Sequence, residues 1–314
     1  MTDSVPSIEA IQAKIGRELL KHGYHPSQIP TDQLRSKIAT LIESEISDTS
    51  PTKRATWEKI INQTLELVER NAGGVYSDIE ILGAIRRGHI TLHPFIPQHI
   101  KGAQVDLTLG GDGFWVANSN KGMWYNPREQ SEVERFFTLK MPSRHDEFCQ
   151  EHGLTMMPGI PAQALVIPIY PQERVLLHTH EYVGILPPGT TTMHARSTWG
   201  RNGIAVCIDA GLGDPGYNTR WTLEGHNLNQ EPVLLVVGER IAQVVFHKTG
   251  PVARPYGGAT SKYDNAVSLE ERIESWNPSM MLPRAFKDNY VAPASLEPIP
   301  DFSTVEFEGD DRDD

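Results

Sequence analysis

The chain has 314 residues, of which 39% are hydrophobic, and 40 acidic against 29 basic residues give a formal net charge of -11. This length allows one good core and a smaller second module. The negative charge argues against a protein that binds nucleic acid through its phosphates, because such proteins need a basic face.

Cysteine usage and the N-terminal residues indicate the compartment. The two cysteines, Cys149 and Cys207, lie far apart in the sequence, so no disulfide framework is indicated. The N-terminal MTDSVPSIEA lacks the basic and apolar segments of a signal peptide, and no apolar run reaches 18 residues. We therefore expect a cytoplasmic protein with no membrane partner.

Residues 1–74 are expected to form a small helical module. Three segments place apolar residues at helical spacing: SIEAIQAKIGRELLKHG, TDQLRSKIATLIESEI and TWEKIINQTLELVERNAGG. Nothing in them suggests chemistry. The module is interpreted as a packing or assembly appendage, with a partner-binding or regulatory role as the alternative and no partner indicated.

Residues 75–266 are expected to form a mainly β domain. A short helix opens it, because Ser77 and Glu80 have the spacing of a capping box and Gly88 can end the helix. Short apolar runs follow without βαβ alternation: AQVDLTLG, QALVIPIY, RVLLHTHEYVGIL and VLLVVGERIAQVVFHK. The pattern predicts an all-β barrel or jelly roll.

Residues 267–314 are expected to be a C-terminal extension. SLEERIESW carries a second capped helix, with Ser268 and Glu271 at the capping positions. Proline-rich and acidic segments follow and end in FEGDDRDD, which is typical of a mobile tail.

Two segments could suggest a metal site, and neither is complete. RHDEFCQEH contains the H-x-E of zinc deaminases but lacks their P-C-x-x-C partner, and it is interpreted as a polar surface loop. His178 and His180 share one face of a predicted strand, yet no third ligand is evident. We expect no zinc.

Polar residues are unusually dense in HARSTWGRNGIAVCIDAGLGDPGYNTRWTLEGHN, residues 194–227. Arg196, Ser197 and Thr198 follow a predicted strand, where a guanidinium, hydroxyls and amide groups can hold phosphate oxygens. Asp214 to Tyr217 reads as a turn that offers a carboxylate to a sugar hydroxyl and a ring to a sugar or base. The segment therefore indicates a nucleotide-like anion as ligand.

Glu224 and a glycine-containing segment further along add to this candidate site. A carboxylate in the middle of an apolar strand is costly unless it points into a polar cavity, so Glu224 is predicted to be a site residue. RPYGGATSKYDN carries Arg254, Tyr256, Lys262 and Tyr263 around mobile glycines, a composition that suits a segment closing over a polyphosphate.

Four blocks, in order, resemble the dCTP deaminase branch of the dUTPase-like superfamily. SDIEILGAIRRGHITLHPFIPQHIKGAQVDLTLG is similar to the family's opening helix and first strands, and ARSTWGRNG resembles its G-R-S-S-L-A-R-x-G block. DAGLGDPGYNTRWTLEGHN resembles T-A-G-x-I-D-P-G-F…L-E-x-x-N, and RPYGGATSKY resembles the closing R-P-Y…S/A-K-Y. The resemblance covers residues 76 to about 265. It implies a distorted jelly-roll β-barrel, a homotrimer with active sites between subunits, and Mg²⁺ that rides on the triphosphate.

The resemblance also implies the role of each site residue. Glu224 matches the catalytic glutamate, and Ser197 and Arg201 match the essential serine and second arginine. The substrate-binding positions are Arg196, Thr198, Tyr256 and Lys262 for the triphosphate, Asp214 and Tyr217 for the deoxyribose, and Ala210 for the attacking water. The chain departs from the family where Asp209 precedes Ala210, and where Ala266 stands near the place of a glutamine.

The activity implied is zinc-independent hydrolytic deamination of dCTP to dUTP and ammonia, with Glu224 as general base. Two alternatives remain open. One is a bifunctional enzyme that goes on to dUMP and pyrophosphate, and the other is a non-enzymatic nucleotide-sensing regulatory protein.

Overall fold

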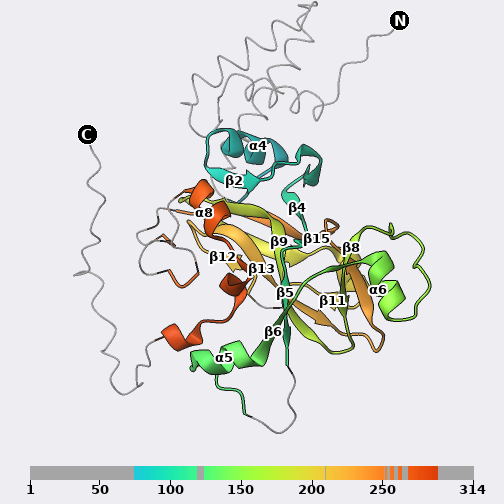
Figure 1. Ribbon diagram of the computed structural model, residues 1–314. Coiled ribbons are helices and arrows are strands. Elements are labelled where there is room, and N and C mark those ends of the chain that lie inside the picture. Colours follow the sequence, from blue (N-terminus) through green and yellow to red (C-terminus); the bar gives the residue numbers. More distant parts are fainter. Residues whose placement is uncertain are drawn as a thin grey trace, which may run out of the picture.

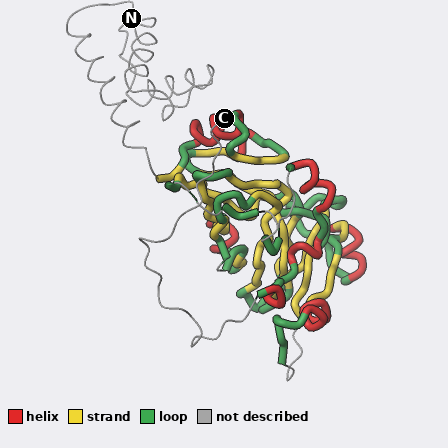
Figure 2. The backbone as a smooth tube through the Cα atoms, turned by 90° about the vertical axis from the view of Figure 1, so that its left-hand side faces the viewer, coloured by secondary structure: helices red, strands yellow, loops and turns green. Residues whose placement is uncertain are grey.

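The computed structural model describes residues 74–288 apart from 119–123, 209, 251, 253–254, 258–260 and 264–267. The three helices expected in residues 1–74, and the acidic end of the chain, lie outside the described residues. The described part is a sandwich of antiparallel sheets with short helices around it (Figures 1 and 2).

The first sheet has the strand order β12-β10-β15-β4-β3, and β1 pairs with the far end of β15. Its strands are β1 (Gly74–Val75), β3 (Ile100–Lys101), β4 (Gln104–Thr108), β10 (Gly189–Ala195), β12 (Leu212–Gly213) and β15 (Arg240–Lys248). A register shift between Arg240 and Ala242 bends β15 where it meets β4. Such a bulge re-aims nearby side chains.

The second sheet has the strand order β11-β13-β9-β5-β6, and β2 pairs with β9. Its strands are β2 (Ile90–His93), β5 (Phe114–Ala117), β6 (Phe137–Lys140), β9 (Arg174–Ile185), β11 (Ile204–Ala205) and β13 (Asn218–Asn227). The predicted β segments are therefore confirmed as strands. A register shift between Arg220 and Thr222 marks the middle of β13.

A small third sheet, β14-β8-β7, lies beside the sandwich and carries α6. The elements are β7 (Ser143–Arg144), α6 (His145–Glu151), β8 (Leu165–Ile169) and β14 (Val233–Val236). The sequence interpretation of RHDEFCQEH as a surface loop was wrong. It forms α6, because Phe148 and Cys149 can pack on Val166, and the buried His145 ring contacts Ile160 O and Met157 N.

Two of the short helices begin at the capping residues that the sequence predicted. The predicted opening helix is α4 (Asp78–Arg86), where Ser77 and Glu80 form both hydrogen bonds of the capping box. The predicted C-terminal helix is α8 (Leu269–Ser275), where Ser268 Oγ accepts from Glu271 N at 3.2 Å. The other helical elements are α5 (Gln130–Phe136), α7 (Ser197–Arg201), η2 (Pro97–His99), η4 (Pro278–Met281) and η5 (Ala285–Lys287). No helix in this part of the chain is long and apolar enough to cross a membrane.

One core fills the space between the two large sheets. Val105, Leu107 and Phe246 enter it from the first sheet, and Leu223 and Trp221 enter it from β13 of the second. Since side chains alternate along a strand, burial of Trp221 and Leu223 in this core turns Thr222, Glu224 and His226 to the outer face. The fold is the jelly-roll-like, mainly β architecture that the sequence predicted.

His178 is fully buried on the outer face of β9, opposite Thr222. Its Nδ1 lies 2.9 Å from Thr179 O, and its Nε2 accepts from Asp112 N at 3.3 Å, so the ring is a neutral tautomer that donates through Nδ1. Burial lowers the pKa of His178 to about 4. Gly110 lies against the ring, where a Cβ would come within 2.0 Å of a ring carbon.

This burial predicts a pH dependence of stability. The folded pKa of His178, about 4, lies below the ordinary 6.5, so between these values the unfolded chain binds the extra proton. Stability should be fully present above pH 6.5 and should fall by about 3 kcal/mol as the pH drops to 4. Urea unfolding at several pH values measures this. His178→Gln should flatten the dependence, whereas the exposed His194→Gln should not. An unchanged slope in His178→Gln would contradict the assignment.

Candidate active site

The residues predicted to hold phosphate lie in and beside α7. β10 ends at Ala195, and Arg196 occupies the N-cap position of α7. Ser197, Thr198 and Arg201 of this helix are exposed. Trp199 anchors the turn, because its Nε1 donates to Arg240 O at 3.0 Å. The structure thus presents two hydroxyls and a guanidinium together at the surface.

A second group gathers at the start of β13. Tyr217 N donates to Asp214 O at 2.9 Å, which closes the predicted turn, and Tyr256 N donates to Pro215 O at 2.7 Å. The rings of Tyr217 and Tyr256 meet edge to face with centroids 5.3 Å apart. Gly216 permits this docking: its φ is +96°, and a Cβ there would lie 2.6 Å from Tyr256 O. Asp214, Tyr217 and Tyr256 therefore form one surface.

Glu224 lies on the outer face of β13, opposite Leu176 of β9, and is partly buried. Its carboxylate forms no hydrogen bond with any described residue. Neither the cavity beside Arg220 nor the one beside α5 includes Glu224 among its lining residues. The polar cavity expected around this carboxylate is therefore neither of these two.

The two groups lie at opposite ends of β13. Tyr217 precedes its first residue, whereas the α7 turn is tied to its other end, where Leu228 N donates to Gly203 O and Asn229 Nδ2 donates to Asn202 O. Tyr217 and Asn227 are ten positions apart along β13, which corresponds to about 33 Å. The turn lies nearer to the start of α7 than this, because Gly213 pairs with Thr191, six residues before Ser197. The structure therefore places the two groups at separate points of one chain.

Two further predicted positions have their own surroundings. Lys262 Nζ pairs with Asp288, and Arg284 donates through Nη1 to Lys262 O. Arg284 N also donates to Tyr263 Oη at 3.2 Å. Lys262 and Tyr263 thus contact the C-terminal segment in this structure. Ala210 is exposed, and the neighbouring Gly211 O accepts from Met193 N at 2.7 Å.

The C-terminal segment after residue 268 packs on the outer face of the second sheet, where Glu224 also lies. Trp115 Nε1 donates to Pro278 O at 2.7 Å, and Leu282 joins a cluster with Val133, Phe137 and Leu176. This face, beside the predicted catalytic carboxylate, is therefore partly covered by residues of the extension.

Arg220 is a residue of this face that the sequence analysis missed. Its guanidinium lies between the rings of Tyr182 and Trp276, at 5.0 and 4.5 Å, and its Nη1 donates to Asp112 at 2.6 Å. It lines a cavity of about 430 Å³ with His93, Pro94, Asp112, His180, Tyr182, Ile273, Trp276, Asn277 and Pro278. A charge in the middle of an apolar strand, the signal that identified Glu224, could have identified Arg220.

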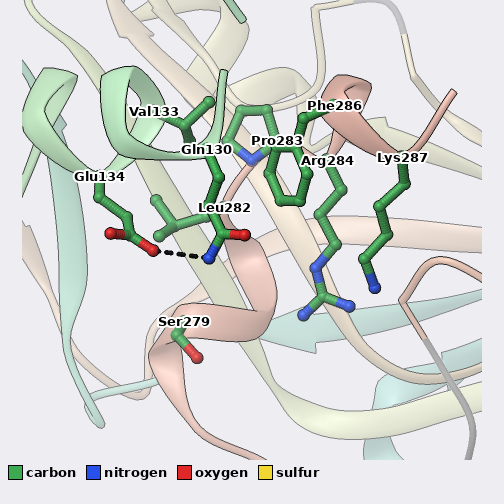
Figure 3. A pocket seen from close by; sticks show the side chains of 9 residues that line it. All are labelled: Gln130, Val133, Glu134, Ser279, Leu282, Pro283, Arg284, Phe286 and Lys287. Atoms are coloured by element: carbon green, nitrogen blue, oxygen red, sulfur yellow. Dashed lines mark hydrogen bonds between the residues drawn. The ribbon is translucent and has the colours of Figure 1, made fainter. Parts of the chain in front are cut away.

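A second cavity, of about 360 Å³, lies between α5 and the C-terminal segment (Figure 3). Gln130 and Glu134 face it from α5 and are joined by a 2.8 Å hydrogen bond. Arg284 and Lys287 project into it from the other side. Among the described residues, no group of three or more His, Cys, Asp or Glu side chains could hold a metal ion.

Comparison with known proteins identifies the class of this β domain. A family model described as dCTP deaminase-like matches residues 75–249, more than half of the chain. The chain therefore belongs to the dCTP deaminase-like family.

Named relatives agree with this assignment. The dUMP-forming dCTP deaminase of Methanothermobacter thermautotrophicus is 33% identical over 60% of this chain and 88% of its own length. The dCTP deaminase of Halorubrum lacusprofundi is 31% identical over 58% and 82%. A crystal structure of 2'-deoxycytidine 5'-triphosphate deaminase from Agrobacterium tumefaciens aligns over 56% of this chain and 48% of that one, with 15% identity and a TM-score of 0.40.

The packing of Trp276 gives a test of the C-terminal segment. Trp276→Ala removes contacts with the Arg220 guanidinium and the His178 ring, so the free energy of unfolding should fall by about 2 kcal/mol. Urea denaturation measures the change. Ile273→Ala, in α8 and 41% exposed, is the matched control and should cost less than about 0.5 kcal/mol. Equal effects of the two substitutions would mean that Trp276 does not anchor the segment.

Proposed function

We propose that this protein deaminates dCTP hydrolytically to dUTP and ammonia. Its membership of the dCTP deaminase-like family supports the nucleotide substrate. The reaction is inferred from the position of Glu224 on β13. The residues that match the family's site occur in the same order along this chain as in the family. The bifunctional alternative, with dUMP and pyrophosphate as products, is favoured by the relatives named dUMP-forming.

The proposed chemistry is general acid–base catalysis. Glu224 takes a proton from water while the water oxygen attacks C4 of cytosine, and the same carboxyl group then delivers the proton to the leaving amino group as ammonia. Ser197 and Arg201 orient the water and offset the charge that develops on the ring. Backbone groups at Ala210 would help to hold that water.

The proposed substrate contacts follow the two groups of residues. Asp214 accepts from a hydroxyl of the deoxyribose and Tyr217 packs against the sugar. Arg196, Thr198, Tyr256 and Lys262 hold the triphosphate, which brings Mg²⁺ on its own oxygens, the ligand type that this ion prefers. Lys262 is paired with the Asp288 carboxylate, so this ion pair must break before Lys262 binds phosphate. Phosphate can replace the carboxylate because both are anions.

We propose that the site is completed between chains of a homotrimer. The resemblance to the family, which implies active sites between subunits, supports this. It agrees with the Glu224 carboxylate, which has no hydrogen-bond partner among the described residues of one chain. The proposal includes a cytoplasmic location and no nucleic-acid partner.

Replacement of the proposed base tests the chemistry. Glu224→Gln should keep dCTP binding and lower kcat by at least about 10²-fold, since the amide cannot take a proton from water. Chromatography of the products from dCTP gives both the rate and the identity of the product, dUTP or dUMP. Glu231→Gln, an exposed position just after β13, is the control and should behave like the parent. Parent-like turnover by Glu224→Gln would rule out its role as the base.

Subunit mixing tests whether two chains share the site. Arg201→Ala and Asp214→Ala subunits carry different tags, are co-expressed, and are isolated as mixed trimers by tandem purification. Each variant alone should be nearly inactive at low dCTP, but each mixed trimer should recover about one intact site in three. If both residues of a site came from one chain, no mixed trimer would have an intact site and activity would stay at the level of the single variants.

A further inference from the structure

Two arginines share one buried carboxylate beside the α7 turn. Asp106, on β4, is 4% exposed, and its Oδ2 accepts from Arg240 Nη1 at 2.9 Å. Its Oδ1 lies 3.2 Å from Arg196 Nε, an ion pair that is not aligned as a hydrogen bond. A buried carboxylate needs compensation, and one cation would supply it. With two guanidiniums and one carboxylate, the cluster carries a formal charge of +1.

The backbone fixes both arginines at this place. Arg240 begins β15 and pairs with Thr108 of β4, two residues from Asp106. Arg196 N donates to Ile241 O at 3.1 Å, so the start of α7 is tied to the residue after Arg240. The carbonyl of Arg240 also accepts from Trp199 Nε1 at 3.0 Å. The three side chains therefore meet because the bulged start of β15 lies between β4 and the α7 turn.

Both guanidiniums keep donors for a ligand. The side chains of Arg196 and Arg240 are 26% and 36% exposed, although they pair with a buried carboxylate. Each guanidinium has five N–H donors, and no hydrogen bond from the Nη2 of either one reaches a described residue. The exposed hydroxyls of Ser197 and Thr198 follow Arg196 directly. The cluster therefore presents two partly exposed forks next to the residues expected to meet phosphate.

We propose that Arg240 is a second phosphate-binding residue beside Arg196, and that Asp106 is the positioning residue that holds the two guanidiniums together for the triphosphate. This inference rests on the proposed function, which supplies the triphosphate. Asp106 contacts Arg196 through Nε and Arg240 through Nη1, which leaves further N–H groups for phosphate oxygens, the acceptors that guanidinium forks match best. Without the carboxylate, the two cations would repel each other and separate.

Substitution of Arg240 tests the inference with three readouts. Arg240→Gln should raise the KM for dCTP about tenfold and change kcat by less than about threefold, because the lost charge-assisted bonds are remote from C4. Isothermal titration with inorganic tripolyphosphate should show a similar loss of affinity. Arg240→Lys, which keeps the charge, should recover part of both. Arg144→Gln, an exposed arginine paired with Asp146, is the matched control and should leave both unchanged.

A second variant and the thermal midpoints exclude a structural explanation. Asp106→Asn should weaken tripolyphosphate binding although it removes an anion, because the two guanidiniums are no longer held together. Tighter tripolyphosphate binding by Asp106→Asn would overturn the positioning role. If Arg240→Gln lowers the thermal midpoint but leaves tripolyphosphate affinity and the KM for dCTP at the parent values, Arg240 only neutralises Asp106 and the inference is wrong. If the parent binds tripolyphosphate through Arg240 but does not deaminate dCTP, the inference stands and the proposed function fails.

Discussion

One long strand of the second sheet, β13, determines where Glu224 lies relative to the core. β13 runs through the second sheet for ten residues, with the Asp214–Tyr217 turn before it and the attachment of α7 beyond it. An extended backbone has a fixed rise, so Tyr217 and Asn227 at the two ends of the strand are held about 33 Å apart. The core side chains of Trp221 and Leu223 fix which face of the strand Glu224 occupies. Packing inside the sandwich therefore decides where the proposed chemistry can take place outside it.

The polar residues of the candidate site differ in the contacts that fix their positions. Arg196 is held by Asp106 and by the backbone of β15. Tyr256 is docked on the turn before β13. Glu224, in contrast, is partly exposed and has no hydrogen-bond partner among the described residues. This contrast agrees with a site that needs a second chain to surround Glu224.

Much of the fold could be predicted from the sequence because its signals are local. The capping box at Ser77 and Glu80, the helix after Ser268, and the alternating apolar runs each depend on neighbours in the chain. α6 was missed because its helical state depends on packing of Phe148 and Cys149 against Val166, a contact between distant residues. Asp106 and Arg240 were missed for the same reason, since their partners become visible only when β4 and β15 are placed. The resemblance identified the site residues but could not show which strand or turn presents each of them.

A structure of the assembled protein with dCTP bound to the Glu224→Gln variant would show whether two subunits share each site. We expect Ser197 and Arg201 of one subunit, and Asp214 and Tyr217 of another, to contact the same nucleotide, with C4 of cytosine next to the substituted side chain on β13. A nucleotide whose contacts all come from one chain, or one bound away from α7, would contradict a shared site.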